Sequence, residues 1–246
     1  MGFISLLTRL AASGVLLAAG CEKTLYLTID TGSMGPAEQI AGVLRKHKVK
    51  ATFFVANEKT TRGDMSMDPA WGPFWKGLVA DGHAFGNHTW RHWYFRRDLP
   101  GGKVAYVSRD GKRENLDRQG VCRELRDSER AFETIAGRKY DKIWRAPGGK
   151  TTPFALKSAS FCGYPEHVGW SPAGFLGDEL PSDRYPNQVL LRNAIRDLKD
   201  GDVLLMHLGI WSRKDPFWPM LDPLLTALEE KGFCFATIPE RRKKGK

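Results

Sequence analysis

Two histidines four residues apart are the first side chains in this sequence that could do chemistry together. His88 and His92 lie in the stretch GNHTWRH, which spans residues 86–92. If this stretch forms one helical turn, positions i and i+4 share a face and both imidazoles can converge on one point. Proteins commonly present two nitrogen ligands to zinc in this way. The spacing alone is weak evidence, because histidines near a loop can also fall at this distance by chance.

Other reactive side chains follow predicted strands, which strengthens the case for a site. Asp30 ends the first predicted strand, Arg145 and Pro147 end a later one, and His207 ends another. Each has a plain structural explanation when taken alone, as a helix cap, a salt-bridge partner or a buried strand-end residue. In α/β folds the carboxyl ends of parallel strands meet at one rim. We therefore expect a carboxylate, a guanidinium and three imidazoles to share that rim.

The elements that must position these residues alternate between strand and helix. Near-continuous apolar or β-branched runs predict strands at residues 24–30, 50–55, 83–87, 142–147, 167–170, 202–207 and 233–238. Apolar residues at helical spacing predict helices at 36–44, 71–80, 121–137, 153–160, 189–198 and 221–228. Residues 96–112 form an irregular excursion, with a hairpin centred on 104–107. The pattern indicates one α/β domain of about seven parallel strands, as an open sheet or a barrel.

The first twenty residues have the pattern of a secretory signal peptide. Arg9 precedes an apolar run that is too short to span a bilayer comfortably, and small residues stand before Cys21. The run LAAGC also resembles the lipobox of bacterial lipoproteins, in which the cysteine is lipidated. We expect export to the periplasm or the exterior, either as a free protein or anchored through Cys21.

Export places four cysteines in an oxidising compartment. Four cysteines allow three pairings, and the sequence does not choose among them. One plausible set joins Cys21 to Cys234 and Cys122 to Cys162. Lipidation of Cys21 would leave one of the other three free.

Composition favours a globular protein and argues against a nucleic-acid partner. The chain has 246 residues, 41% of them hydrophobic, with a formal net charge of +10. Part of this excess stands at residues 241–246, which we predict to be a solvated basic tail, and no nucleic-acid motif accompanies it. We expect a monomer whose only membrane contact would be a lipid anchor.

Four short motifs give the chain a specific family resemblance. The segments TIDTG (28–32), HTWRH (88–92), RAPGG (145–149) and LMH (205–207) resemble four of the five ordered motifs of the polysaccharide deacetylases. This group is also called the NodB-homology family or carbohydrate esterase family 4. The resemblance implies a catalytic domain over residues 21–240 with a distorted, partly open β/α barrel. It also implies metal-dependent removal of acetyl groups from N-acetylated amino sugars, as in chitin oligomers, peptidoglycan or exopolysaccharide.

The resemblance also implies a role for each matching residue. His88 and His92 would bind a divalent metal, zinc before cobalt or nickel, that activates water and the amide carbonyl. Asp30 would be the general base, Arg145 would orient it, and His207 would protonate the leaving amine. Pro147 would contact substrate.

Trp170 would also contact substrate, because its ring would form one side of the acetyl pocket.

Two departures from the family pattern bear on these roles. The first motif usually has two adjacent aspartates, the second a metal ligand, whereas Thr31 stands here in its place. Either Asp30 or Thr31 would then be the third ligand, or the metal would bind less tightly. The fourth motif normally supplies an aspartate that tunes the acid histidine, but no carboxylate follows Trp170 until Asp178. His207 would lack its usual partner unless Asp178 or Glu179 folds back.

Two other functions remain open on the sequence. Thr31 and the missing fourth motif are also compatible with a non-catalytic glycan-binding relative. An aspartate followed by threonine resembles, more loosely, deacylases that act on lipid-linked formamido sugars. A deacylase or deformylase of another N-acyl sugar would keep the chemistry and change the substrate.

Overall fold

The structure is a computed structural model, and it describes residues 23–244. The signal peptide, the lipid anchor at Cys21 and the last two residues of the predicted basic tail lie outside this range. Within it, no helix is long and apolar enough to cross a membrane.

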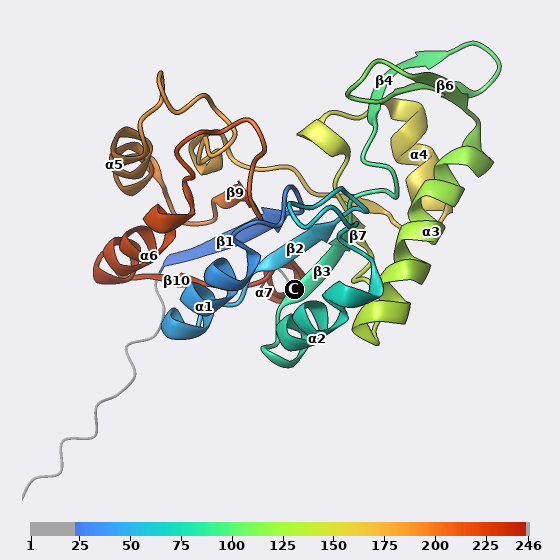
Figure 1. Cartoon of the computed structure of the whole chain (residues 1–246). Coiled ribbons are helices and arrows are strands. Elements are labelled where there is room, and N and C mark those ends of the chain that lie inside the picture. Colours follow the sequence, from blue (N-terminus) through green and yellow to red (C-terminus); the bar gives the residue numbers. More distant parts are fainter. Residues whose placement is uncertain (1–22, 245–246) are drawn as a thin grey trace, which may run out of the picture.

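The described chain is built around one parallel sheet of seven strands (Figure 1). Its strands run in the order β10-β1-β2-β3-β7-β8, and β9 also pairs with β1. The strands are β1 (Lys23–Asp30), β2 (Thr52–Val55), β3 (Ala84–Asn87), β7 (Ile143–Trp144), β8 (Glu166–His167), β9 (Val203–His207) and β10 (Phe233–Phe235). The predicted α/β class, single domain and partly open barrel of about seven strands are confirmed.

Strand β1 is the centre of this sheet because it has three neighbours. Its first three residues pair with β10, and the remaining residues, from Tyr26 to Asp30, pair with β9. Residues 28–30 also pair with β2. Strands β8 and β9 do not pair with each other. Among the described residues, the segment between them contacts β9 through one isolated bridge, from Phe175 to Leu205. The barrel is therefore open on that side.

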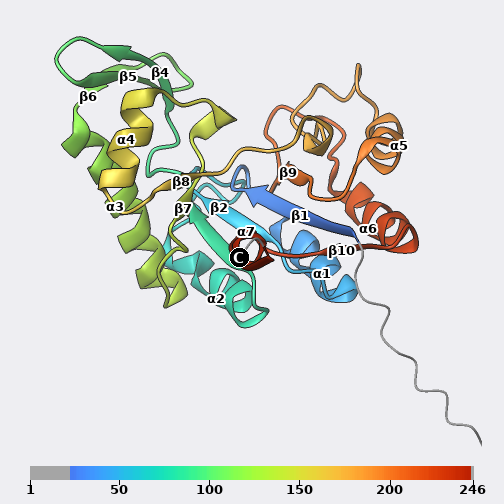
Figure 2. The ribbon, with the colours of Figure 1, turned by 180° about the vertical axis from the view of Figure 1, so that it is seen from behind.

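Helices cover the outer face of the sheet. In Figure 1, α1 and α2 lie in front of it, α3 and α4 flank β7 on one side, and α5 and α6 lie beyond β9. Seen from behind in Figure 2, α7 lies on the opposite face. The helices are α1 (Ala37–His47), α2 (Gly72–Ala80), α3 (Arg118–Ala136), α4 (Pro153–Phe161), α5 (Asn187–Asp197), α6 (Leu221–Glu230) and α7 (Ile238–Lys244), with 3-10 turns at η1 (Pro69–Trp71), η2 (Pro147–Gly149), η3 (Pro172–Gly174) and η4 (Trp218–Met220).

Alternation along the buried strands separates two apolar cores. In β1, Leu25, Leu27 and Ile29 pack with the helices, whereas Tyr26 joins a smaller cluster on the inner face of the barrel. That inner cluster also contains Phe54 and Ile238 at the start of α7. Successive side chains point to opposite faces of a strand, so the inner face continues upward to the even-numbered position Asp30.

Residues 94–116 form a second, antiparallel sheet of three strands beside the barrel. It consists of β4 (Tyr94–Leu99), β5 (Lys103–Val107) and β6 (Arg113–Leu116). The prediction of a hairpin centred on 104–107 found β5 but missed β6. Three of the four residues in β6 are exposed, with only Leu116 buried, so its sequence lacks an apolar strand pattern.

The cysteine pairing is partly confirmed. Cys122 of α3 and Cys162, which follows α4, form a disulfide. Cys234 is also disulfide-bonded, while its predicted partner, Cys21, lies outside the described residues.

The predicted last strand was too long. It ends at Phe235, and Ile238 begins α7, which contains Arg241 of the predicted tail.

Candidate active site

The inner positions at the carboxyl ends of the strands bring the predicted reactive residues together. Asp30 of β1 is the register partner of His207 in β9 and of Phe54 in β2. On the other side of β2, Asn87 of β3 pairs with Trp144 of β7, so the residues that follow, His88 and Arg145, leave these strands at the same level. Parallel pairing thus collects the four side chains at one rim.

Asp30 and Arg145 form a buried ion pair. Arg145 Nη1 donates to Asp30 Oδ1 at 2.7 Å, and neither side chain is more than 5% exposed. The guanidinium is fixed by two further bonds, from Nε to the Val168 carbonyl at 2.9 Å and from Nη2 to the Gly169 carbonyl at 3.0 Å. Burial acts to raise the pKa of Asp30, but the charges of Arg145 and the nearby histidines outweigh it and lower that pKa.

The two histidines meet, although not through a helical turn. Residues 88–93 form a loop after β3, in which Thr89 and His92 adopt left-handed backbone angles, with φ of 66° and 54°. The expected helical turn is therefore wrong, because left-handed residues interrupt a right-handed helix. The loop nevertheless brings His88 Nε2 to 3.2 Å from His92 Nε2 and 3.4 Å from Asp30 Oδ2.

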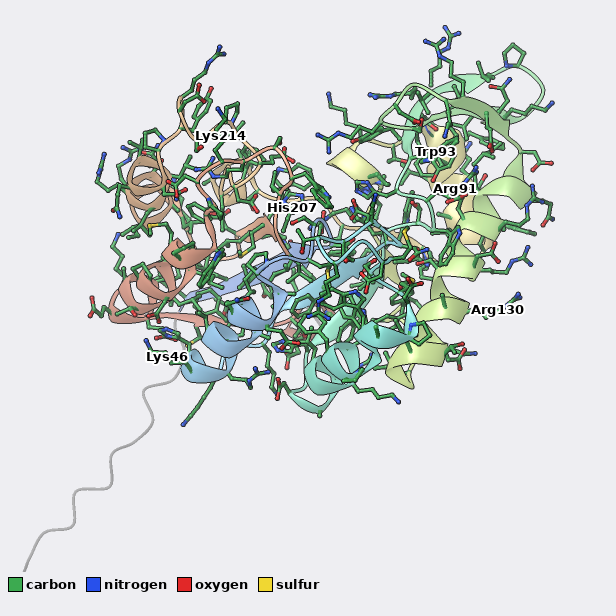
Figure 3. All side chains as sticks on the ribbon, viewed as in Figure 1. Lys46, Arg91, Trp93, Arg130, His207 and Lys214 are labelled. Atoms are coloured by element: carbon green, nitrogen blue, oxygen red, sulfur yellow. A yellow bond between two sulfur atoms is a disulfide. The ribbon has the colours of Figure 1, made fainter. Side chains whose placement is uncertain are left out.

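Ion pairs from neighbouring elements hold this loop. Glu124 of α3 accepts from the Arg91 backbone N–H at 3.0 Å and from Arg91 Nε at 2.5 Å. Glu114 of β6 accepts from both Nη atoms of Arg91, and Tyr106 of β5 donates to Glu124 at 3.0 Å. Figure 3 shows Arg91 and Trp93 on the β4–β6 side of the molecule, with His207 nearer its centre. The second sheet and α3 thus fix the position of His92.

The histidine pair has the donor geometry of two ligands on one metal ion. Two donors about 2.0–2.1 Å from a tetrahedral zinc ion lie roughly 3.3 Å apart, which matches the separation of the two Nε2 atoms. His88 Nδ1 lies 2.8 Å from the Arg145 carbonyl, so it carries the proton and leaves Nε2 free as a donor. His92 Nδ1 lies 3.4 Å from Glu58, which orients it in the same sense.

A third ligand is not part of this arrangement. Among the described residues, no three His, Cys, Asp or Glu side chains form a ready metal-binding group. Thr31 is buried, and its Oγ1 accepts a hydrogen bond from the Ala56 backbone N–H at 3.1 Å. The residues therefore fit a metal held by two imidazoles, with the Asp30 carboxylate 3.4 Å from His88 Nε2.

A carboxylate does fold back onto His207. Asp178 Oδ2 accepts from the His207 backbone N–H at 2.7 Å, and its Oδ1 lies 3.1 Å from His207 Nδ1. Glu179 lies 3.9 Å from Nε2. Burial acts to lower the pKa of His207, but Asp178 above all, with Asp30 and Glu179, raises that pKa to about 9. Asp178 thus takes the position in which the sequence showed no partner.

The two predicted substrate contacts lie on the Arg145 side. Pro147 is buried and opens η2. Trp170 packs against Gly149, where an added Cβ would come within 2.3 Å of the indole. It lines a hollow of about 280 Å³ that contains none of His88, His92 or His207. Its role in an acetyl pocket stays a prediction.

Two adjoining hollows form a cleft over the histidines. One, of about 290 Å³, is lined by His92 and His207, and the other, of about 630 Å³, extends along the β4–β6 side. They share Glu58, His92, Tyr94, Arg109 and Trp211. Sequence reasoning missed Glu58 and Trp211, which lie in loops without a readable pattern.

Comparison with known proteins identifies relatives of this chain. The sequence profile described as polysaccharide deacetylase matches residues 18–167. A peptidoglycan-N-acetylglucosamine deacetylase from Bacillus cereus is 27% identical over 223 residues, which cover 89% of this chain and 88% of that protein. A chitooligosaccharide deacetylase from Azorhizobium caulinodans is 22% identical over 231 residues, covering 89% and 94%.

Solved structures share the fold. A family 4 acetyl xylan esterase from Clostridium thermocellum, in complex with a cobalt ion, superposes with a TM-score of 0.66 at 21% identity, covering 89% of each chain. A mutant of a family 4 pseudoenzyme from Bacillus anthracis, described as having restored enzymatic activity, gives a TM-score of 0.65 at 25% identity. That match covers 89% of this chain and 66% of the other.

Proposed function

This chain belongs to the polysaccharide deacetylase family, and on that premise we propose that it is an exported, metal-dependent hydrolase that removes N-acetyl groups from amino-sugar glycans. The observation that carries the proposal is the pair Asp30 and His207. They are register partners on adjacent strands, yet their environments lower the pKa of one and raise that of the other. Two neighbouring groups whose environments shift their pKa values in opposite directions are suited to act as base and acid.

In the proposed mechanism, Asp30 is ionised and accepts a proton from the attacking water, while Arg145 fixes its orientation. His207 is protonated because Asp178 stabilises its charge, and it donates a proton to the nitrogen of the departing amine. His88 and His92 would hold a divalent cation, zinc or alternatively cobalt or nickel. When bound, that cation would supply Lewis acidity toward the acetyl carbonyl and water.

The disulfide between Cys122 and Cys162 supports an extracytoplasmic location, since structural disulfides persist in oxidising compartments. The signal peptide over residues 1–20, the catalytic domain over 21–240 and the basic tail over 241–246 are part of the same proposal. Export with or without a lipid on Cys21 fits it equally.

Acetate release is the direct test. Purified protein would be incubated with zinc, cobalt or nickel and with N-acetylated chitin oligomers or peptidoglycan fragments. We expect acetate from at least one substrate, and a loss of at least about a hundredfold in Asp30→Asn, as is typical when a general base is removed. Formate in place of acetate would indicate the deformylase alternative. No acid from any substrate, with metal bound, would overturn the proposal.

A non-catalytic, glycan-binding role is the second candidate, and Thr31 is the observation that favours it. Its hydroxyl bonds to the Ala56 backbone N–H, and a neutral hydroxyl is a poor metal ligand. Thr31→Asp would add a carboxylate beside Asp30, with Thr31→Val as the control that adds none. Activity that appears only in Thr31→Asp would favour this second candidate, whereas an active wild-type protein would exclude it.

A further inference from the structure

Trp211 is the one tryptophan among the described residues that is exposed, at 54%. The others are buried or packed on partners: Trp170 stacks on Phe175, and Arg91 lies over the ring of Trp93. Within the described part of the chain, no aromatic ring or cation packs on the indole of Trp211. A large apolar ring left uncovered in a cleft is available to pack against a ligand, because ligand sites are lined by aromatic side chains and burial of apolar surface is favourable.

The position of Trp211 indicates what covers it. The residue stands four positions after His207 and lines both hollows of the cleft. Tyr94, whose ring centre lies 6.1 Å from that of His92, also lines both hollows. The indole therefore lies beside the reacting centre, at the junction of the two hollows, and not in a remote surface patch.

The size of the cleft exceeds the needs of one reacting sugar. The hollow at His92 and His207 has a volume of about 290 Å³, and the adjoining hollow about 630 Å³. Sites for compact ligands have volumes of roughly 300–1,000 Å³. The smaller hollow is at the lower end of that range, so the larger one is left for further units of a chain.

We propose that Trp211 is a substrate-specificity residue that packs against the apolar face of a pyranose ring next to the reacting unit. The inference rests on the proposed deacetylase function and adds to it the side chain that holds the sugar beside the reacting unit. An aromatic face suits a pyranose, whose axial C–H groups form an apolar surface, while the rim hydroxyls remain in water.

The test compares Trp211→Ala and Trp211→Phe with Phe161→Ala as a matched control. Phe161 is 65% exposed, lies at the end of α4, and packs with Arg118 away from the cleft. Acetate release would be followed on N-acetylated chitin oligomers of two to six units. We expect wild-type kcat/KM to rise with chain length, Trp211→Ala to lose about tenfold on the longer oligomers, and Trp211→Phe to retain most of the rise. Phe161→Ala should match the wild type.

Binding without turnover separates this inference from the proposed function. Calorimetry on protein treated with a chelator would use the chitin tetramer and a peptidoglycan glycan-chain fragment. Weaker binding in Trp211→Ala, by about tenfold, supports the inference even if no acetate is ever released. Equal affinity in Trp211→Ala and wild type, or no binding of either probe to the wild type, overturns it.

Discussion

At the scale of single residues, the site depends on how each charge is compensated. Asp30 and Arg145 are both buried, and removing either would leave an unpaired buried charge. His88 is buried beside His92, and burial lowers the pKa of His88 to about 4, so it is neutral and able to donate a lone pair. At neutral pH these environments therefore keep Asp30 ionised, His207 protonated and His88 neutral.

The Asp178→Asn variant tests the acid. Asp178 is the main reason that the pKa of His207 is raised to about 9, and burial alone would lower it. With a neutral amide at this position, we expect the pKa of His207 to fall toward its ordinary value of 6.5, since only Asp30 and Glu179 would still raise it. The alkaline limb of the kcat/KM profile should then move to lower pH by about two units, with activity lost at pH 8.

Glu179→Gln is the control for this change, because Glu179 is 48% exposed and 3.9 Å from the imidazole. Its profile should move by much less. An alkaline limb that stays in place in Asp178→Asn would show that His207 is not the acid.

At the scale of elements, the site residues are fixed by neighbours outside the parallel sheet. The loop that carries His92 is held by Glu124 of α3, Glu114 of β6 and Tyr106 of β5. The segment that carries Asp178 follows η3 and returns to β9, where Asp178 bonds the His207 backbone. Both attachments join parts of the chain that are far apart in sequence.

The Glu124→Gln variant tests the first attachment. The Glu124 side chain is 6% exposed and that of Arg91 is 32% exposed. The amide keeps the shape but not the charge, so Arg91 loses its more buried ionic partner. Because Arg91 reaches solvent, we expect a loss of about 2 kcal/mol in the free energy of unfolding, together with weaker zinc binding by calorimetry.

Glu114→Gln removes the more exposed partner of the same arginine, since Glu114 is 44% exposed. Its cost should stay under about 1 kcal/mol. Equal losses in the two variants would show that burial of Glu124 does not matter.

His83, which precedes β3, makes the stability of the folded protein depend on pH in the acid range. Its Nδ1 accepts from the Ala51 backbone N–H at 3.0 Å, and burial lowers the pKa of His83 to about 4. The unfolded chain binds a proton near pH 6.5, whereas the folded chain binds it only near pH 4. This contribution to stability is therefore complete above pH 6.5 and is lost as the pH falls toward 4.

In urea titrations between pH 7 and 4.5, His83→Gln should show a shallower loss of stability than the wild type. The slopes should differ by up to about 1.4 kcal/mol per pH unit, the value for one proton. Parallel curves would mean that the pKa of His83 is the same in the folded and the unfolded protein.

The elements and the site differ in how far the sequence predicted them. The buried strands were predictable because β1, β2 and β9 are rich in apolar and β-branched residues and buried on both faces, and their ends located Asp30 and His207. The partner of His207 was foreseen only as an alternative, since no local pattern says where a loop rich in Gly and Pro returns. The helical turn at 88–92 was wrong because the tertiary contacts of Arg91 determine that loop. Strand β6 was missed because its pairing depends on backbone bonds and not on apolar residues.

At the scale of the whole molecule, a disulfide joins the two helices beside the second sheet. Cys122 and Cys162 are 40 residues apart and link α3 to the end of α4. A cross-link that closes a loop of that length lowers the entropy of the unfolded chain. In the chain-entropy model this raises the free energy of the unfolded state by about 4 kcal/mol.

Replacing both cysteines by alanine should therefore lower the free energy of unfolding by about 2–4 kcal/mol. The drop in Tm should be roughly 5–15 °C for a domain of this size. Calorimetry under non-reducing conditions measures it, and no change in Tm would contradict the prediction. Activity at 25 °C should persist, since neither cysteine lines the cleft.

The pairing of β1 has a consequence for the order of folding. Thr24 pairs with Cys234, and Tyr26 pairs with Val203, so the first described strand finds partners on one edge only near the end of the chain. Contacts of such large sequence separation slow folding, because the loop between them must close before they form. During synthesis, β1 keeps an unpaired edge until β9 and β10 have emerged. The rim that holds Asp30 beside His207 is therefore assembled only after residues 203–207 have been made.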